Sequence, residues 1–290
     1  MKYFVYLAGL LGLIAAIILV THQNWSAISG AFDHAGWALL WLLPFHALPL
    51  LLDVMGWRAL LAPSDPQRRA GTPFLFWVAT VREACNRLLP VANVGGEIVG
   101  IRLVKWRGVE GAPAAASVIM EVLLTLVSQY IFVALGLLLL IGMAGHIGTL
   151  NSVIWAVIAT LPLPIGLAWL FRHGQVFSRL ESFAEKLLGG PSRFTELLDG
   201  ARLDDEVRKL YGKPARLTVA CAWQVAGFMV GSFKSWLALQ LLGYPISVWD
   251  AIAIEATAQA KNGVVSVPTL YSLTVNEASA QVVDAGHKYD

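Results

Sequence analysis

The longest stretch of this sequence without a formal charge reads VLLTLVSQYIFVALGLLLLIGMAGHIGTLNSVIWAVIATLPLPIGLAWLF, residues 122–171. A helix needs about 20 apolar residues to cross the hydrocarbon core of a bilayer. Fifty residues are therefore too many for one helix. The middle of the stretch predicts a turn, because glycines and polar residues gather there: Gly142, Gly145, His146, Gly148 and Asn151. We expect two spans, roughly 115–142 and 152–171.

Composition also favours a protein that lies largely in a membrane. Soluble domains are about 25% charged, whereas charged residues make up 14% of these 290 residues and hydrophobic residues make up 57%. Eleven Trp and seven Tyr suit the aromatic belts at the two membrane surfaces. The net charge of +2 is too small to favour nucleic acid as a partner.

Metal and cofactor sites are not expected. Cys85 and Cys221 are the only cysteines and form no CxxC pair, and the six His residues show no HxxxH or HExxH spacing. No P-loop and no nucleophile elbow is present. We therefore expect two free thiols, no resident metal and no cofactor.

Two further charge-free runs precede the central stretch. Residues 3–20 could be a signal peptide, but no small-residue cleavage site follows, so we interpret them as a retained span. Residues 35–52 contain Pro44 and Pro49, which predict a kinked span whose freed carbonyl groups are satisfied by neighbouring helices.

The last two expected spans are less uniform. Residues 217–242 are apolar except for Lys234, and their Gly227-x-x-x-Gly231 spacing predicts close helix packing. A weaker sixth span begins near Trp249 and contains Glu255. The fold class predicted is therefore all-α: a polytopic helical membrane protein with about six transmembrane helices plus broken or re-entrant half-helices.

Lys and Arg are concentrated in alternate connections. Eight of them lie within residues 58–107 and nine within 172–216, whereas three segments contain none: 21–35, 143–151 and 243–249. Basic connections mark the cytoplasmic side of a membrane protein. Lys2 belongs to the same side, so the N terminus is predicted to be cytoplasmic.

Residues 74–105 do not form a simple span. The apolar start is too short to cross, and charged residues, Pro90 and a Gly-Gly pair follow it. Glu83 and Arg87 have the i,i+4 spacing of a helical ion pair. A broken or re-entrant element of this kind survives only where it is buried in protein or lines a wet cavity. The alternative is an interfacial amphipathic helix followed by a cytoplasmic turn.

Residues 172–216 are the longest polar stretch. Apolar residues at helical spacing predict an amphipathic helix, and a second helix is expected over 193–211. We interpret the stretch as a cytoplasmic helical hairpin that lies on the membrane. It divides the chain into a first bundle half, 1–171, and a second transmembrane part, 217–290, with an atypical polar C-terminal tail.

Ionisable residues within spans are costly and by default mark a functional site. Glu121, Lys234 and Glu255 qualify, although a structural buried pair is the alternative reading for the two glutamates. Together with the broken segment they form the predicted substrate-binding set: Arg82, Glu83, Asn86, Arg87, Gly95, Gly96, Glu97, Arg102, Glu121, Lys234 and Glu255. No catalytic residue is expected, because no pairing of a nucleophile with a base is visible.

Three pieces of the chain carry a resemblance: REACNRLLP at 82–90, VGGE at 94–97 with Arg102, and AIAIEATAQA at 251–260. They resemble the lysylphosphatidylglycerol synthase transmembrane (flippase-like) family, and within it the hopanoid-biosynthesis-associated membrane proteins of the HpnL type. The likeness covers roughly residues 1–260. After it the chain keeps Val267-Pro268 but lacks the expected glycine-rich turn.

The resemblance implies a protein of the bacterial inner membrane that handles lipids, linked to hopanoids or related cell-envelope lipids. Membrane lipids are then the expected partners, with lipid-biosynthetic enzymes as a second class. Some relatives carry a soluble aminoacyl-transferase domain, for which this chain has no room. A flippase-like transporter is expected first. The alternatives are a membrane enzyme that modifies a lipid headgroup and a non-catalytic scaffold of a lipid-biosynthetic complex.

Overall fold

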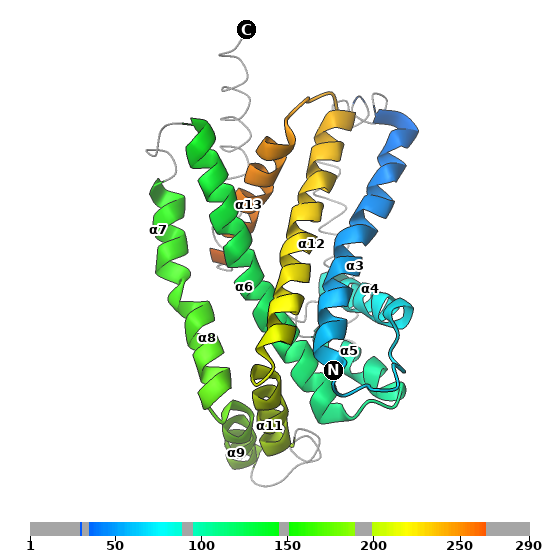
Figure 1. The fold of residues 1–290 in the computed structure, drawn as a ribbon, viewed down its shortest axis with the longest axis vertical. Helices are drawn as coiled ribbons and strands as arrows, with labels where there is room; N and C mark the ends of the chain where they lie inside the picture. Colours follow the sequence, from blue (N-terminus) through cyan, green and yellow to red (C-terminus); the bar gives the residue numbers. More distant parts are fainter. Residues whose placement is uncertain (1–29, 31–34, 89–94, 145–150, 189–198, 265–290) are drawn as a thin grey trace.

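The computed structural model describes residue 30 and residues 35–88, 95–144, 151–188 and 199–264, and every regular element in these ranges is a helix (Figure 1). The all-α prediction is confirmed. The three longest helices lie side by side along the long axis of the molecule: α3 Leu42–Leu61, α6 Gly111–Ala144 and α12 Pro214–Leu241. A short helix, η1 Gly36–Trp41, leads into α3. The predicted first span, 3–20, lies outside the described residues.

The remaining apolar segments complete this bundle. α7 Asn151–Thr160 and α8 Pro162–His173 follow one another where a single span was predicted. The break falls at Leu161, immediately before Pro162, which lacks the backbone N–H that would continue the ladder. α13 Val248–Val264 returns beside α6 and α12.

Large apolar side chains on the long helices point outward. By length and hydropathy, two helices in the described ranges could cross a membrane, Gly36–Leu61 and Gly111–Gly142, and only 6% and 22% of their most apolar stretches are buried. The core helix of a soluble protein would be mostly buried instead. α12 is long enough to cross as well, but its polar residues make it less hydrophobic than those two helices. Exposed apolar surface of this extent suits contact with lipid. Examples are Leu43, Leu138, Ile165 and Trp169.

Four shorter helices surround the lower ends of the bundle in Figure 1: α4 Thr72–Leu88, α5 Gly95–Trp106, α9 Val176–Leu188 and α11 Gly200–Tyr211. α6 has 34 residues and is therefore about 51 Å long, well beyond the ~30 Å of a hydrocarbon core. α5 and α11 pack against its first turns, and we infer that this polar-flanked end is the one that extends beyond the hydrocarbon core. The four short helices and the connections beside them carry most of the basic residues of the sequence.

The stretch predicted as a hairpin, 172–216, contains the helices α9 and α11; α11 begins at Gly200, and residues 189–198 are outside the described part. Asp204 of α11 holds the start of α9 by accepting hydrogen bonds from the Ser178 amide at 3.0 Å and the Ser178 hydroxyl at 2.6 Å. The apolar face of α11 packs on α6 through Leu203, Val207 and Leu210. The hairpin is therefore docked on the bundle.

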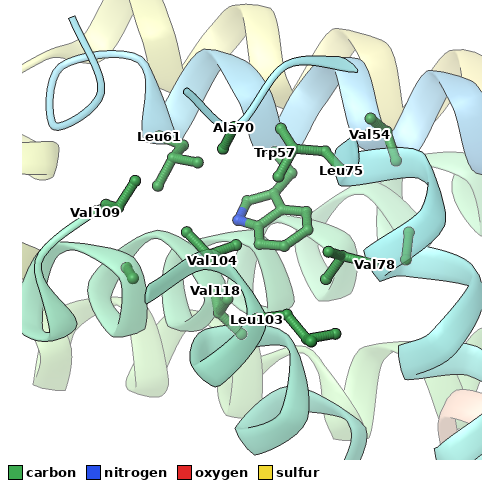
Figure 2. Close-up of a cluster of buried hydrophobic side chains, with 12 residues drawn as sticks. Val54, Trp57, Leu61, Ala70, Leu75, Val78, Leu103, Val104, Val109 and Val118 are labelled. Atoms are coloured by element: carbon green, nitrogen blue, oxygen red, sulfur yellow. The ribbon is translucent and has the colours of Figure 1, made fainter. Parts of the chain in front are cut away.

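A buried cluster around Trp57 fixes α4 and α5 against α3 and α6 (Figure 2). Trp57 is 0% exposed, and its indole N–H donates to Ser117 Oγ at 3.1 Å, which satisfies its one polar atom. Its apolar neighbours come from all four helices; examples are Val54, Val78, Val104 and Val118. This packing points the long side chain of Arg82 on α4 toward α6.

The predicted close packing at Gly227 is confirmed. A Cβ added there would lie 2.7 Å from Asp53 Oδ1 and 3.5 Å from the Pro49 carbonyl oxygen, both on α3. α12 and α3 therefore meet with no room for a side chain at this point.

Candidate functional site

Arg82 lies at the centre of the largest buried ionic group in the described structure. It projects from α4 toward α6 and is only 7% exposed. Its guanidinium carbon lies 4.7 Å from the centroid of a Trp57 ring, within the range of a cation–π contact. The Trp57 packing therefore positions the guanidinium and covers one of its faces.

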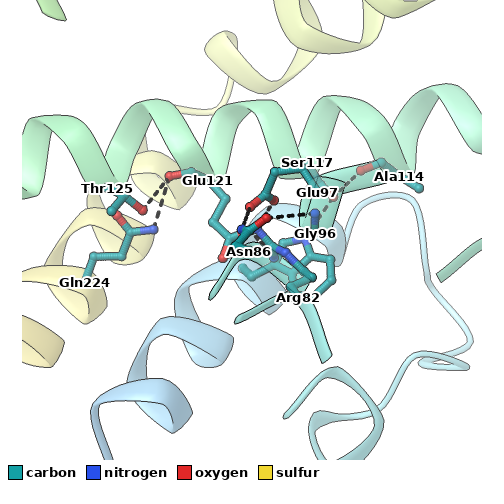
Figure 3. A network of polar contacts seen from close by, with 10 residues as sticks. Arg82, Asn86, Gly96, Glu97, Ala114, Ser117, Glu121, Thr125 and Gln224 are labelled. Atoms are coloured by element: carbon teal, nitrogen blue, oxygen red, sulfur yellow. Dashed lines mark hydrogen bonds and ion pairs between the residues drawn. The ribbon is translucent and has the colours of Figure 1, made fainter. Parts of the chain in front are cut away.

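Two carboxylates from different helices hold the guanidinium (Figure 3). Arg82 Nη1 donates to Glu121 Oε2 of α6 at 2.7 Å, and Arg82 Nη2 donates to Glu97 Oε2 of α5. Asn86 adds a weaker contact, from its Nδ2 to Glu97 Oε1 at 3.4 Å. We call Arg82, Asn86, Glu97 and Glu121 the Arg82 cluster.

Two glycines allow α5 to approach α4 closely enough for these contacts. A Cβ on Gly96 would lie 2.6 Å from Asn86 Oδ1, and a Cβ on Gly100 would lie 2.6 Å from Arg82 Cδ. The Gly96 amide, one of the unpaired N–H groups of the first turn of α5, donates to Asn86 Oδ1 at 2.8 Å. The predicted Gly-Gly break thus starts α5, with Gly95 as its first residue.

The Arg82 cluster contains more negative than positive charge. With all groups ionised, one guanidinium (+1) and two carboxylates (−2) sum to −1. Arg82 Nε and Gln224 Oε1 are the buried side-chain atoms without a hydrogen-bond partner among the described residues. Gln224 of α12 approaches the cluster by donating from Nε2 to the Glu121 carbonyl oxygen at 3.3 Å. With both carboxylates ionised, the cluster together with Gln224 therefore has a net negative charge, one unpaired donor and one unpaired acceptor.

The other residues predicted on α4 and α5 lie at the edge of this cluster. The helical ion pair is confirmed, with Arg87 Nη2 2.7 Å from Glu83 Oε1. His46 Nε2 of α3 lies 3.5 Å from the same carboxylate oxygen. Arg87 and Arg102 are exposed, and Arg102 makes no ion pair within the ranges that the structure describes.

Glu255 belongs to a second group, higher in the bundle. Ser235 Oγ donates to Glu255 Oε2 at 2.7 Å, and Gln259 Nε2 donates to Glu255 Oε1 at 3.2 Å. Gln129 of α6 joins them by donating to the Gln259 carbonyl oxygen at 3.0 Å. We call Gln129, Ser235, Glu255 and Gln259 the Glu255 cluster.

Glu255 therefore hydrogen-bonds to hydroxyl and amide groups and pairs with none of the predicted arginines in the described ranges. Lys234 precedes Ser235, is partly buried, and makes no ion pair with any residue the structure describes. The described part of the chain ends at residue 264. Up to that residue, α6 contributes a side chain to each of the two clusters.

In the part of the chain that the structure describes, no group of His, Cys, Asp and Glu side chains could hold a metal ion.

The chain matches one family model over most of its length. The model, described as the lysylphosphatidylglycerol synthase TM region, covers residues 5–283. The chain belongs to that family. No curated protein and no solved structure matches it. Membership in the lysylphosphatidylglycerol synthase TM region family makes this a membrane protein linked to lipid metabolism. The match does not separate the HpnL type from the rest of the family.

Several side chains that build the site in this family member were not among the sequence candidates. Trp57 and Ser117 support Arg82, Gly100 makes room for it, and Gln129 and Gln224 extend the polar contacts along α6 and α12. A usable signal existed for Gly100, because it repeats Gly96 at the i,i+4 spacing typical of close helix packing. Gln129 is polar within an apolar span, which is also a detectable signal. Nothing in the sequence marks Trp57.

Proposed function

We propose that this protein is a flippase-like lipid transporter of the bacterial inner membrane, linked to hopanoid or related cell-envelope lipids, with its N terminus in the cytoplasm. Family membership supports a role in lipid metabolism. The observation that carries the proposal is the Arg82 cluster, an ionic group buried between α6 and two shorter helices, α4 and α5, that do not form simple spans. Buried charge on broken helices is typical of transport sites.

The depth of the cluster suits a lipid headgroup. Glu121 is the last charged residue before the fifty-residue stretch 122–171. The projecting first turns of α6 therefore favour a position near the boundary between the hydrocarbon core and the inner headgroup layer. A lipid can present its headgroup to this level while its tails stay among the exposed apolar side chains of the long helices.

The chemistry of the cluster indicates the class of headgroup. In this conformation Arg82 is occupied by two carboxylates and Arg87 by Glu83, so neither guanidinium is open to an anionic group. The net negative charge of the cluster and the unpaired amide oxygen of Gln224 favour a headgroup that donates hydrogen bonds, either hydroxyl groups or an ammonium. Exposed Arg102 is the remaining predicted arginine that could meet a phosphate.

A headgroup-translocation assay tests the proposal. Purified protein is placed in phosphatidylcholine vesicles with a tail-labelled fluorescent lipid, and outer-leaflet fluorescence is quenched over time. Three probes are compared: a lysyl-phosphatidylglycerol, a polyol-headed glycolipid and a phosphatidylglycerol. We expect faster movement of at least one donor-rich probe than in protein-free vesicles, and at least a tenfold loss in Glu97→Gln.

Glu110→Gln is the matched control, because Glu110 also pairs with an arginine, Arg202, but on the exposed surface. Transport that survives Glu97→Gln unchanged would remove the Arg82 cluster from the mechanism. If no probe moves faster than in empty vesicles, the transport proposal is wrong. Mass spectrometry of the recovered probe separates transport from the enzymatic alternative, since transport leaves the headgroup chemically unchanged.

A further inference from the structure

Three polar residues of α6 stand at intervals of four: Glu121, Thr125 and Gln129. In a helix with 3.6 residues per turn, positions four apart form one ridge that turns by about 40° at each step. The rise of 1.5 Å per residue places Gln129 about 12 Å above Glu121. We call these residues the α6 ridge.

The two ends of the α6 ridge belong to the two polar clusters. Glu121 is buried against Arg82, with 2.7 Å between Oε2 and Nη1. Gln129 contacts α13 through the Gln259 carbonyl oxygen at 3.0 Å. Through Gln259 the ridge reaches Glu255, whose Oε1 lies 3.2 Å from Gln259 Nε2. The ridge therefore connects the Arg82 cluster with the Glu255 cluster.

The midpoint of the ridge is open. Thr125 is exposed, although Glu121 before it is buried and Gln129 after it is partly covered. The Thr125 hydroxyl donates to the Glu121 carbonyl oxygen at 2.9 Å, a common arrangement for Thr in a helix. That bond uses the one donor of the hydroxyl and leaves its lone pairs as acceptors. Figure 3 shows Thr125 and Gln224 beside Glu121, on the far side from Arg82.

We propose that the α6 ridge is the track along which a donor-rich lipid headgroup passes between the Arg82 cluster and the Glu255 cluster, with Thr125 as its midpoint. The inference rests on the proposed transport function. Carboxylate, hydroxyl and amide oxygens would accept the headgroup's hydrogen bonds in turn. The exposed face at Thr125 would then be hydrated, in contrast with the lipid-facing side of α6.

Hydration can be measured without any lipid substrate. Thr125→Cys and Ile131→Cys are made in a background in which Cys85 and Cys221 are replaced by Ala, and each protein is placed in phosphatidylcholine vesicles. Ile131 is the matched control, because it is also exposed on α6, 41%, but is apolar and lies off the ridge. A charged methanethiosulfonate reagent reacts with a thiol only where water reaches it. We expect the thiol of Thr125→Cys to react at least tenfold faster than that of the control; equally slow reaction of both would overturn the track.

If the cysteine variants fold poorly, a second variant, Thr125→Val, tests the same inference. Thr125→Val keeps the shape of the side chain and removes the hydroxyl. We expect lipid movement to slow at least threefold, with no change in the thermal midpoint of the purified protein. If Thr125→Val moves lipid at the wild-type rate, the proposed track is wrong, even if the thiol of Thr125→Cys is hydrated. A wild-type protein that moves no probe would refute the transport proposal instead, and the thiol measurement would still report whether this face is wet.

Discussion

The Arg82 cluster and the Glu255 cluster stabilise a carboxylate between helices in two different ways. Both place a carboxylate among helices in or near the membrane, and both use α6. The Arg82 cluster pairs its two carboxylates, on α5 and α6, with one guanidinium from α4. The Glu255 cluster has no cation among the described residues and meets its carboxylate with Ser235 and Gln259.

The difference indicates separate roles. A buried ion pair is costly to break, because either partner alone is left as an unpaired buried charge. Hydrogen bonds from a hydroxyl and an amide are exchanged at less cost. We infer that the ion pairs of the Arg82 cluster also fix how α4 and α5 sit on α6, so that a headgroup there must compete with existing pairs. The Glu255 cluster exchanges its partners for those of a ligand more easily.

Removal of Arg82 should give the largest effect. Arg82→Met leaves Glu97 and Glu121 without their cation, and losing one partner of a buried pair costs about 3–5 kcal/mol. We expect a large fall in the amount of monodisperse protein in detergent size-exclusion chromatography and in its thermal midpoint. Arg87→Ala is the control: it breaks an exposed helical pair worth about 0.3–0.5 kcal/mol. Comparable losses in both variants would contradict a structural role for the Arg82 cluster.

Glycine substitutions test the packing under each cluster. Gly96→Ala would press a methyl group against Asn86, and Gly136→Ala would overlap the Ala256 methyl group of α13. Overpacking of this kind costs about 1–3 kcal/mol. We expect lower thermal midpoints for both, whereas Gly166→Ala, where nothing lies within 4 Å, should be neutral or stabilising. If Gly96→Ala behaves like Gly166→Ala, the close approach of α5 to α4 is not required.

The smallest effect on stability is expected at Glu255. Glu255→Gln keeps a carbonyl acceptor for Ser235 Oγ and should change the free energy of unfolding by about 1 kcal/mol or less. The same change should slow lipid movement in vesicles if this cluster receives a headgroup. A stability loss as large as that of Arg82→Met would mean that the two clusters do not differ in the way described.

The sequence predicted a helical membrane protein from properties of single segments. Charge-free runs of about 20 residues predict helices in a bilayer whatever their neighbours are, because unpaired charge is costly there at any position. The helices α6 and α12 and the start of α13 were therefore predicted near their observed positions, whereas α3 continues to Leu61, beyond the end predicted at residue 52. The Glu83–Arg87 pair and the packing at Gly227 were also predictable, since both depend on spacing within one helix.

The composition of the site depended on contacts between distant parts of the chain. Arg82, Glu97 and Glu121 were each candidates, yet their sequence spacing does not show that one guanidinium binds both carboxylates. That arrangement requires Trp57 to hold α4 and Gly100 to admit the arginine stem. Likewise, only the packing of α13 on α6 reveals that the Glu255 cluster includes a side chain of α6. Hydropathy and helical spacing act along the chain, so the sequence determined the spans. Pairing of charges depends on distances in space, so the tertiary structure decided the site.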